Sequence, residues 1–243
     1  MKIKVIACEV IRKELDILLS EHRENEISVC YMTKELHERG KEYMATEIQK
    51  EIDKVSVSEF DAIALVFGLC NNGVVNLCGE LPIVIPRAHD CITLFMGSKE
   101  RYKEYVSEKP GSYFIAGDFG IETDGVDGNV GLDHTKIIQE LRQEYEEKYG
   151  EENVDYLMEM LGDPLKNYSR LTYIDDGLGD LYNMKEKAKV AAKSRDWTYE
   201  EYSGNLSLVE RLIDGDWYEE DCLVLKPGEK VNASYSDEII IGT

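Results

Sequence analysis

The sequence has no long apolar run and little positive charge, and each absence excludes a class of protein. No stretch approaches the roughly 18 to 20 apolar residues that a helix needs to cross a bilayer, so we do not expect a membrane-embedded protein. Lys and Arg number 28 against 49 Asp and Glu, which gives a net charge of −21. Phosphate backbones and anionic lipids repel such a chain. We therefore expect neither nucleic acid nor a membrane surface as its partner.

Compact local motifs are also missing. The sequence has no CxxC pair, no GxGxxG after its first predicted strand, no GxSxG, no phosphate-binding P-loop and no HExxH. Any functional site must therefore be built from residues that are far apart in the 243-residue chain and that the fold brings together.

Alternating apolar and amphipathic segments predict an α/β protein. Short β-branched or fully apolar segments predict strands at 2–7, 26–32, 61–67, 82–86, 112–116, 171–175 and 222–225. Helical periodicity covers 9–22, 41–55, 91–106 with a break near Gly97, 133–161 with a break near Gly150, 181–192 and 206–213. Because βα units build parallel sheets, we expect a mostly parallel, doubly wound, Rossmann-like sheet with helices on both faces.

The domain organisation follows from the same pattern. We expect a single α/β domain over residues 1–243, with two pseudo-halves that meet near residue 125. The glycine-rich segment 117–131 is expected to form an ordered loop there. The first residues predict a strand instead of an export signal, because charge returns after about four apolar residues. We therefore expect a cytoplasmic, reducing location, where cysteines stay as thiols, metal ligands or core residues.

The six cysteines are unevenly distributed. Five lie within residues 1–120, where 15 Lys and Arg against 20 Asp and Glu give a net charge of −5. Residues 121–243 contain one cysteine and carry 13 − 29 = −16. The acidic half is expected to be a solvated face or a docking face for a basic partner.

Three cysteines directly follow predicted strands. Cys8 follows 2–7, Cys70 follows 61–67 and Cys91 follows 82–86. Ligands bind at the carboxyl edge of parallel sheets, so these thiols should open onto one crevice together with His89. Three thiols and an imidazole suit zinc, and three thiolates can also hold an iron–sulfur cluster with one open iron. The plainer alternative is core packing, because free cysteine is among the most buried residue types.

Other cysteines and histidines are expected to be structural. Cysteines inside or at the start of predicted elements should pack in the core: Cys30, Cys78 and Cys222. Histidines in polar helical surroundings should lie at the surface: His22, His37 and His134.

Polar residues near the strand ends are candidate ligand-binding residues: Asn71, Asn72, Gly73, Arg87, Asp90 and Asp175. The turn at 71–73 either opens a helix at Val74, whose N–H groups suit an anion, or is a plain turn. Arg87 either binds a carboxylate or phosphate through its guanidinium or pairs with Asp90. Asp175 either reaches the sheet edge or begins an ordinary Asp-Gly turn.

Several of these segments resemble a family catalogued as domain of unknown function 1638. The specific motifs are Gly68-Leu69-Cys70-Asn71-Asn72-Gly73-Val74-Val75 and Pro86-Arg87-Ala88-His89-Asp90-Cys91-Ile92. Weaker matches extend the resemblance over nearly the whole chain: Cys8-Glu9-Val10, Gly97-Ser98, Pro110-Gly111, Tyr173-Ile174-Asp175 and Gly215-Asp216-Trp217. The resemblance adds Ser98 to the candidate ligand-binding residues.

The same resemblance implies a metabolic context. Members of that family occur in methanogenic archaea and anaerobic bacteria, often beside genes for corrinoid-dependent methyltransferase components. It implies a place in anaerobic one-carbon or methylamine metabolism and brings no reaction with it. At the level of the site, His89-Asp90-Cys91 is similar to the His-x-Cys element of zinc-dependent thiol methyltransferases, with Cys8 or Cys70 as the distant ligand. The chain has too few βα units for their eight-fold barrel.

Three functions stay open at this point, and whether the protein is an enzyme is open as well. The first is a zinc or iron–sulfur protein of methyl-transfer metabolism that uses Cys8, Cys70, His89 and Cys91, with a small molecule or corrinoid methyltransferase components as partners. The second is a metal-free, racemase-like enzyme in which two cysteines act as acid and base. The third is a non-enzymatic carrier of a ligand or corrinoid for a methyltransferase.

Overall fold

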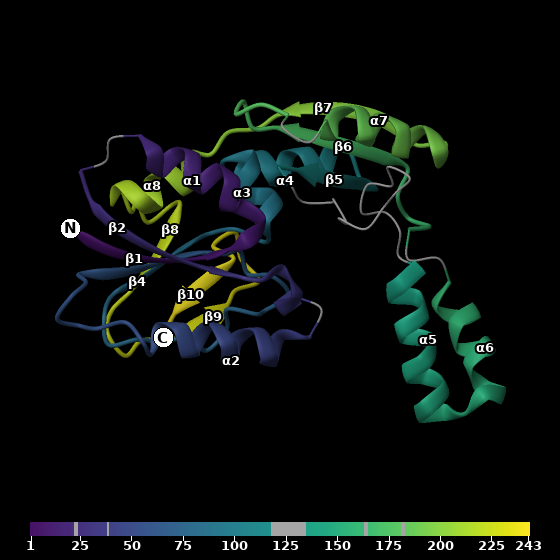
Figure 1. Cartoon of the computed structure of the whole chain (residues 1–243), viewed down its shortest axis with the longest axis horizontal. Helices are drawn as coiled ribbons and strands as arrows, with labels where there is room; N and C mark the ends of the chain where they lie inside the picture. Colours follow the sequence, from purple (N-terminus) through teal and green to yellow (C-terminus); the bar gives the residue numbers. More distant parts are fainter. Residues whose placement is uncertain (22–23, 38, 118–134, 163–164, 181–182) are drawn as a thin grey trace. The chain divides into compact units, whose positions relative to one another are not determined.

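The computed structural model describes the chain except for residues 22–23, 38, 118–134, 163–164 and 181–182 (Figure 1). The chain forms two compact units, each made of separate stretches of sequence. Unit 1 contains Met1–Glu108, Ile174–Gly179 and Ser203–Thr243, and unit 2 contains Lys109–Tyr173 and Asp180–Tyr202. The predicted meeting point near residue 125, and nearly all of the predicted loop 117–131, lie outside the described residues. The single-domain organisation stays a prediction.

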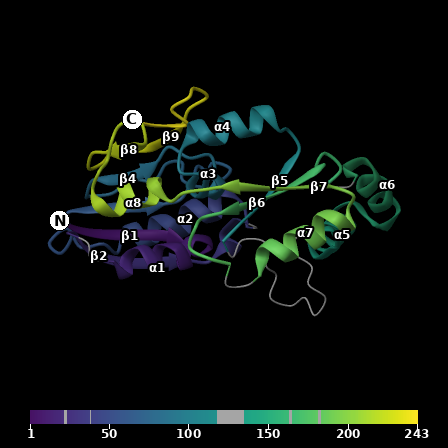
Figure 2. The same cartoon turned by 90° about the horizontal axis from the view of Figure 1, so that it is seen from above.

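Unit 1 is built on a five-stranded sheet of order β2-β1-β3-β4-β8. Its strands are β1 (Lys2–Cys8), β2 (Glu26–Met32), β3 (Ala62–Val66), β4 (Ile83–Pro86) and β8 (Cys222–Leu225). The first four are parallel, and β8 is antiparallel to β4. Strand β8 lies beside β4 (Figure 2). Strands β3 and β4 are buried throughout because apolar residues point to both of their faces. The prediction of a mainly parallel α/β sheet is confirmed, and its doubly wound, Rossmann-like form stays a prediction.

Helices flank this sheet, with α1 and α8 on one side and α2 on the other (Figure 1). The helical elements of unit 1 are η1 (Glu9–Ile11), α1 (Arg12–Ser20), η2 (Lys34–His37), α2 (Lys41–Ile52), α3 (Cys91–Met96), α4 (Lys99–Glu108) and α8 (Ser207–Asp214). Helix α3 ends at Gly97, whose φ is +84°, and a Cβ there would overlap the Asn205 side chain. The predicted break near Gly97 is confirmed.

No helix begins at Val74, so of the two alternatives for residues 71–73 the structure shows the plain turn. Residues 70–76 form turns, and Cys70, Asn71 and Asn72 have φ values of +46°, +55° and +69°. Three consecutive positive φ angles lie outside the right-handed helical region, and they turn the chain before a helix can start. The hairpin of β9 (Val231–Ala233) and β10 (Ile240–Gly242) completes unit 1.

Unit 2 has its own three-stranded sheet, of order β5-β6-β7. Its elements are β5 (Ser112–Ala116), α5 (Thr135–Tyr149), α6 (Glu151–Leu161), β6 (Arg170–Asp175), α7 (Met184–Ser194) and β7 (Thr198–Ser203). Ile115, Leu171 and Met184 pack in one buried cluster of this unit, and β5 pairs with β6 and not with a strand of the main sheet. Helices α5 and α6 break at Gly150, as predicted, where φ is +82°. Strand β7 is missing from the prediction because its sequence, TYEEYS, is largely polar.

Neither unit contains a helix, within the described residues, that is both long and apolar enough to cross a membrane.

Candidate functional site

Three cysteines line one small cavity at the carboxyl edge of the unit 1 sheet. Cys8 ends β1, Cys70 follows β3, and Cys91 begins α3 just after β4. Strands β1, β3 and β4 are neighbours in the sheet, which is why residues so far apart in sequence meet. The cavity offers about 10 Å³, roughly the space of one water-sized sphere. The sheet therefore brings together three of the four residues predicted as metal ligands.

The histidine at this cavity is His37, and not His89. The Nε2 atom of His37 lies 3.7 Å from the Sγ atom of Cys8, and His37 also lines the cavity. The side chain of His89 lines a different, larger pocket, with its ring centroid 5.8 Å from that of Tyr102. His37 is exposed, as predicted, but a surface position did not exclude a place at the site. The sequence offers one signal for the position of His37, which follows the predicted strand 26–32 by a few residues. In the structure that strand, β2, neighbours β1, which ends at Cys8.

Burial keeps the three thiols protonated. Desolvation raises the pKa of Cys8 to about 11 and that of Cys70 to about 12, and it raises the pKa of Cys91 well above its ordinary value. For Cys70 and Cys91, electrostatic repulsion from Asp90 and from the neighbouring thiols adds to the effect of burial. A catalytic cysteine needs a lowered pKa, because the thiolate is the reactive form. Metal-free acid–base catalysis by these thiols is therefore the alternative that the site supports least.

The donor chemistry of the cavity suits zinc. Three thiolates and one imidazole form one of the common tetrahedral zinc sets. Within the described part of the chain, no group of three or more His, Cys, Asp or Glu side chains is already arranged to hold a metal ion. Metal binding would therefore require these side chains to move, and a cysteine sulfur can move by rotation about its single side-chain torsion.

The loop after β3 and the loop after β4, which position Cys70 and Cys91, contact each other closely. The backbone N–H of Cys70 donates to the carbonyl of His89 at 2.9 Å. A Cβ at Gly68 would lie 2.6 Å from the Cα and N atoms of Asp90, so only glycine permits this approach. The left-handed conformation of Cys70 costs about 1 to 2 kcal/mol, and such strain clusters at functional sites.

Several residues predicted to bind a ligand form hydrogen bonds with the local backbone. Three of them accept hydrogen bonds from backbone N–H groups: Asp90 from Thr93 (3.2 Å), Ser98 from Arg101 (3.2 Å) and Asp175 from Gly177 (3.0 Å). In the turn at 71–73, Asn71 is exposed and Gly73 packs against Met44, whereas Asn72 lines the larger pocket.

Arg87 holds the C-terminal segment of unit 1 through hydrogen bonds to three backbone carbonyls. Its side chain is buried, and its Nε atom donates to the carbonyl of Glu219 at 2.7 Å. Its Nη1 atom donates to the carbonyls of Glu238 at 2.9 Å and Ile240 at 2.6 Å. The two roles predicted for Arg87, anion binding and pairing with Asp90, have no support in this geometry.

Replacing Arg87 with leucine should strongly destabilise unit 1. The carbonyls of Glu219 and Ile240 lose their donor, whereas the Glu238 carbonyl keeps a hydrogen bond from the Ile240 N–H at 2.7 Å. Each unsatisfied acceptor costs about 1 to 3 kcal/mol, so the free energy of unfolding should fall by about 2 kcal/mol or more. Urea denaturation measures this change. The control is Arg39→Leu, which removes an exposed arginine that bonds the Tyr43 hydroxyl and should cost less than about 1 kcal/mol. Equal midpoints for Arg87→Leu and the wild-type chain would contradict the assignment.

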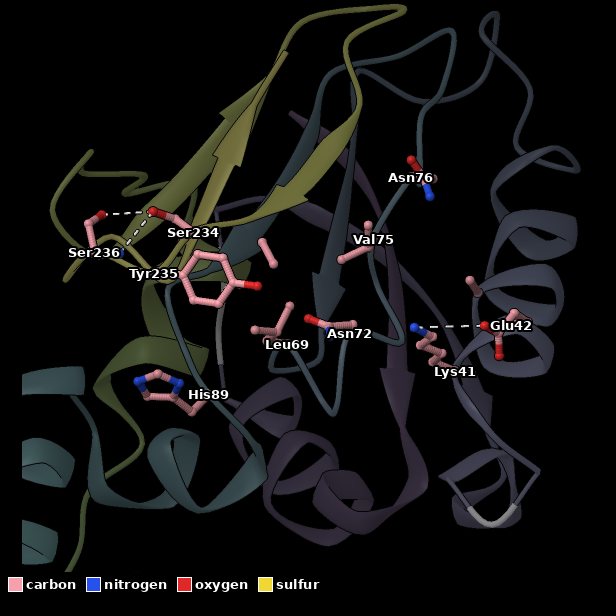
Figure 3. Close-up of a pocket in the computed structure, with 12 residues that line it drawn as sticks. Lys41, Glu42, Leu69, Asn72, Val75, Asn76, His89, Ser234, Tyr235 and Ser236 are labelled. Atoms are coloured by element: carbon pink, nitrogen blue, oxygen red, sulfur yellow. Dashed lines mark hydrogen bonds and ion pairs between the residues drawn. The ribbon is translucent and has the colours of Figure 1, made fainter.

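A larger pocket, of about 620 Å³, uses the same two loops (Figure 3). Leu69 and Asn72 come from the loop after β3, and His89 comes from the loop after β4. The start of α2 and residues 233–236 supply the remaining wall. Residues of each loop thus alternate between the thiol cavity and this pocket.

Most of the chain matches the model of a known protein family. That family, described as "Protein of unknown function (DUF1638)", matches residues 31–213. No curated protein and no solved structure matches the chain. The matched segment contains His37, Cys70 and Cys91, and Cys8 lies before it.

Proposed function

Since this chain belongs to the family described as Protein of unknown function (DUF1638), whose description names no activity, we propose a function from the site itself. The protein binds one zinc ion through Cys8, Cys70 and Cys91, with His37 as the fourth ligand. The observation that carries this proposal is the convergence of three thiols, from three neighbouring strand ends, on one cavity beside an imidazole.

Core packing alone accounts less well for this arrangement. Cysteine can serve as a small apolar residue, and Cys222 does so where it is fully buried at the start of β8. The residues at the cavity differ because a polar imidazole nitrogen lies 3.7 Å from one of the sulfurs. In addition, the chain holds Cys70 in a strained backbone conformation, which apolar packing does not require.

The proposal favours zinc over an iron–sulfur cluster. A cavity with about 10 Å³ of free space suits a single ion, whereas a cluster would require the surrounding loops to move. Bound zinc stabilises a fold when all four positions are taken by the protein, and it activates a thiol when one position is open. The exposed His37, on the short η2, is the ligand best placed to exchange with a substrate. Thiol activation is the role that fits the methyl-transfer metabolism implied by the resemblance, and a reducing cytoplasm would keep these thiols free.

Metal analysis of protein purified without oxygen tests the proposal. We expect about one zinc per chain in the wild-type protein and less than about a tenth of that in Cys91→Ser. The matched control is Cys30→Ser, because Cys30 lies in β2 and faces Glu51 at 3.7 Å. It should keep its zinc. Circular dichroism of each variant separates loss of metal from loss of fold.

Cobalt substitution gives a second readout that counts the sulfur ligands. Co(II) in place of zinc should show sulfur-to-metal charge-transfer absorption. At Co(II) concentrations that saturate each variant, this absorption should fall by about a third in Cys70→Ser and stay nearly unchanged in His37→Ala. Iron and sulfide in the purified wild-type protein would overturn zinc in favour of a cluster. Metal-free protein with all six thiols titratable would overturn the metal site altogether.

A further inference from the structure

The larger pocket has the size of a site for a small organic molecule. Its volume of about 620 Å³ falls within the range of roughly 300 to 1,000 Å³ that is usual for ligand pockets. It lies entirely within unit 1, at the carboxyl ends of β3 and β4, where α/β sheets bind their ligands. Size and position therefore mark it as a second site, separate from the thiol cavity.

The walls of this pocket carry no net formal charge. Its two formally charged lining residues, Lys41 and Glu42, form an ion pair of 3.8 Å with each other (Figure 3). Apolar contact comes from Leu69 and Val75. Because the whole chain also carries a charge of −21, an anionic ligand would be repelled. An uncharged ligand suits these walls best.

Tyr235 offers an aromatic ring with nothing packed on it. Its side chain is fully exposed, with a relative accessibility of 109%, and its ring stands at the wall of the pocket (Figure 3). The turn beneath it is braced, since the Ser234 and Ser236 hydroxyls are 2.8 Å apart and the Ser236 N–H donates to the Ser234 hydroxyl at 3.1 Å. An exposed aromatic ring carried by such a braced turn is suited to stacking against a planar ligand.

Asn72 supplies the polar contact inside the pocket. Its amide points into the space between Leu69 and Lys41 (Figure 3), and no side-chain hydrogen bond to it is formed from the described residues. A free carboxamide can donate and accept at once, which is how asparagine reads the edge of an adenine ring. His89, on the other loop, provides a further nitrogen.

We propose that this pocket binds an uncharged, planar nitrogen heterocycle of nucleoside size, stacked on Tyr235 and hydrogen-bonded to Asn72. The proposal goes beyond the zinc site and does not depend on it. Leu69 and Val75 supply the apolar surface for the ring.

Isothermal titration of the full chain with adenosine tests this proposal, with 5′-AMP and ribose as comparison ligands. We expect saturable adenosine binding with a Kd below about 1 mM, binding of 5′-AMP at least about tenfold weaker, and no heat from ribose. Tyr235→Ala and Asn72→Gly should each weaken adenosine binding about tenfold. Glycine is chosen at position 72 because it keeps the φ of +69° without strain.

The control is Tyr156→Ala, which removes another exposed tyrosine, in α6, and should bind adenosine like the wild-type protein. Three results would overturn the proposal. They are the absence of saturable adenosine binding, 5′-AMP binding as tight as that of adenosine, and wild-type affinity in Tyr235→Ala.

Discussion

At pH 8.5 the Glu14→Gln variant should be more stable than the wild-type chain by about 2 to 4 kcal/mol, whereas at pH 5 the two should be nearly equal. Glu14 lies on α1, its side chain is fully buried, and neither carboxylate oxygen receives a hydrogen bond from the described residues. Burial, assisted by the nearby Asp176 carboxyl group, raises the pKa of Glu14 to about 8. The Lys13 ammonium, 3.9 Å away, opposes this shift only in part.

The direction of the effect follows from proton linkage. The folded-state pKa of Glu14 is about 8 and its ordinary value is 4.5, so between these values the folded chain holds a proton that the unfolded chain has lost. The contribution of protonated Glu14 to the free energy of unfolding is therefore complete below about pH 4.5, and it is lost as the pH rises to about 8. A glutamine side chain does not ionise, so Glu14→Gln does not lose stability as the pH rises.

Denaturant titrations from pH 5 to pH 9 measure this difference. Groups far from Glu14 titrate alike in the two proteins, so the difference in stability reports on Glu14 together with its neighbour Asp176. Glu59→Gln, at an exposed position, should show no pH-dependent difference from the wild-type chain. Asp176→Asn should reduce the pH dependence, because it removes one of the influences that raise the pKa of Glu14. If Glu14→Gln were less stable than wild type at every pH, Glu14 would instead be held as a carboxylate by Lys13.

The second large effect concerns zinc affinity, which should rise about a thousandfold for each pH unit between pH 6 and pH 8. The pKa of Cys8 is about 11 and that of Cys70 about 12, and the pKa of Cys91 lies well above its ordinary value. All three thiols are thus protonated across this range, and a metal that binds them as thiolates must release three protons. Each proton contributes about a factor of ten per pH unit. Competition against a chromophoric chelator of known pH dependence gives the slope.

Cys70→Ser tests the number of protons released, because this variant has one titrating ligand fewer. The residual affinity of this variant should rise only about a hundredfold per pH unit, since two protons are released. Cys222→Ala should leave the slope at three protons, because Cys222 lies outside the thiol cavity although burial also raises its pKa, to about 11. A slope of one proton or fewer in the wild-type protein would mean that the cysteines do not bind zinc together.

The main sheet could be predicted from sequence because its strands are locally unambiguous. The segments of β1, β3 and β4 are short, apolar and flanked by helical periodicity, so both their type and their parallel pairing follow. The second sheet could not be predicted in this way. Whether β5 extends the first sheet or pairs with β6 depends on tertiary packing around Ile115 and Leu171, which leaves no local pattern.

The candidate site was predictable where strand ends determine it. Cys8, Cys70 and Cys91 follow neighbouring strands, and their shared cavity follows from the order of those strands. The choice between His37 and His89 could not be made from sequence, because both follow strands and the choice depends on which way each loop turns. The role of Arg87 could not be predicted from sequence either. Its guanidinium donates to backbone carbonyls about 130 to 150 residues away, and no local pattern indicates such partners.

The antiparallel strand β8 affects the risk that the nascent chain aggregates before it has folded. It covers the outer edge of β4, a strand of four fully buried residues that would otherwise present unpaired backbone groups. Because β8 comes from residues 222–225, this edge stays open during synthesis until more than 130 residues after β4 have been made. While these residues are being made, the nascent chain therefore exposes an apolar strand edge that can aggregate, and β8 covers this edge only after it has been synthesised.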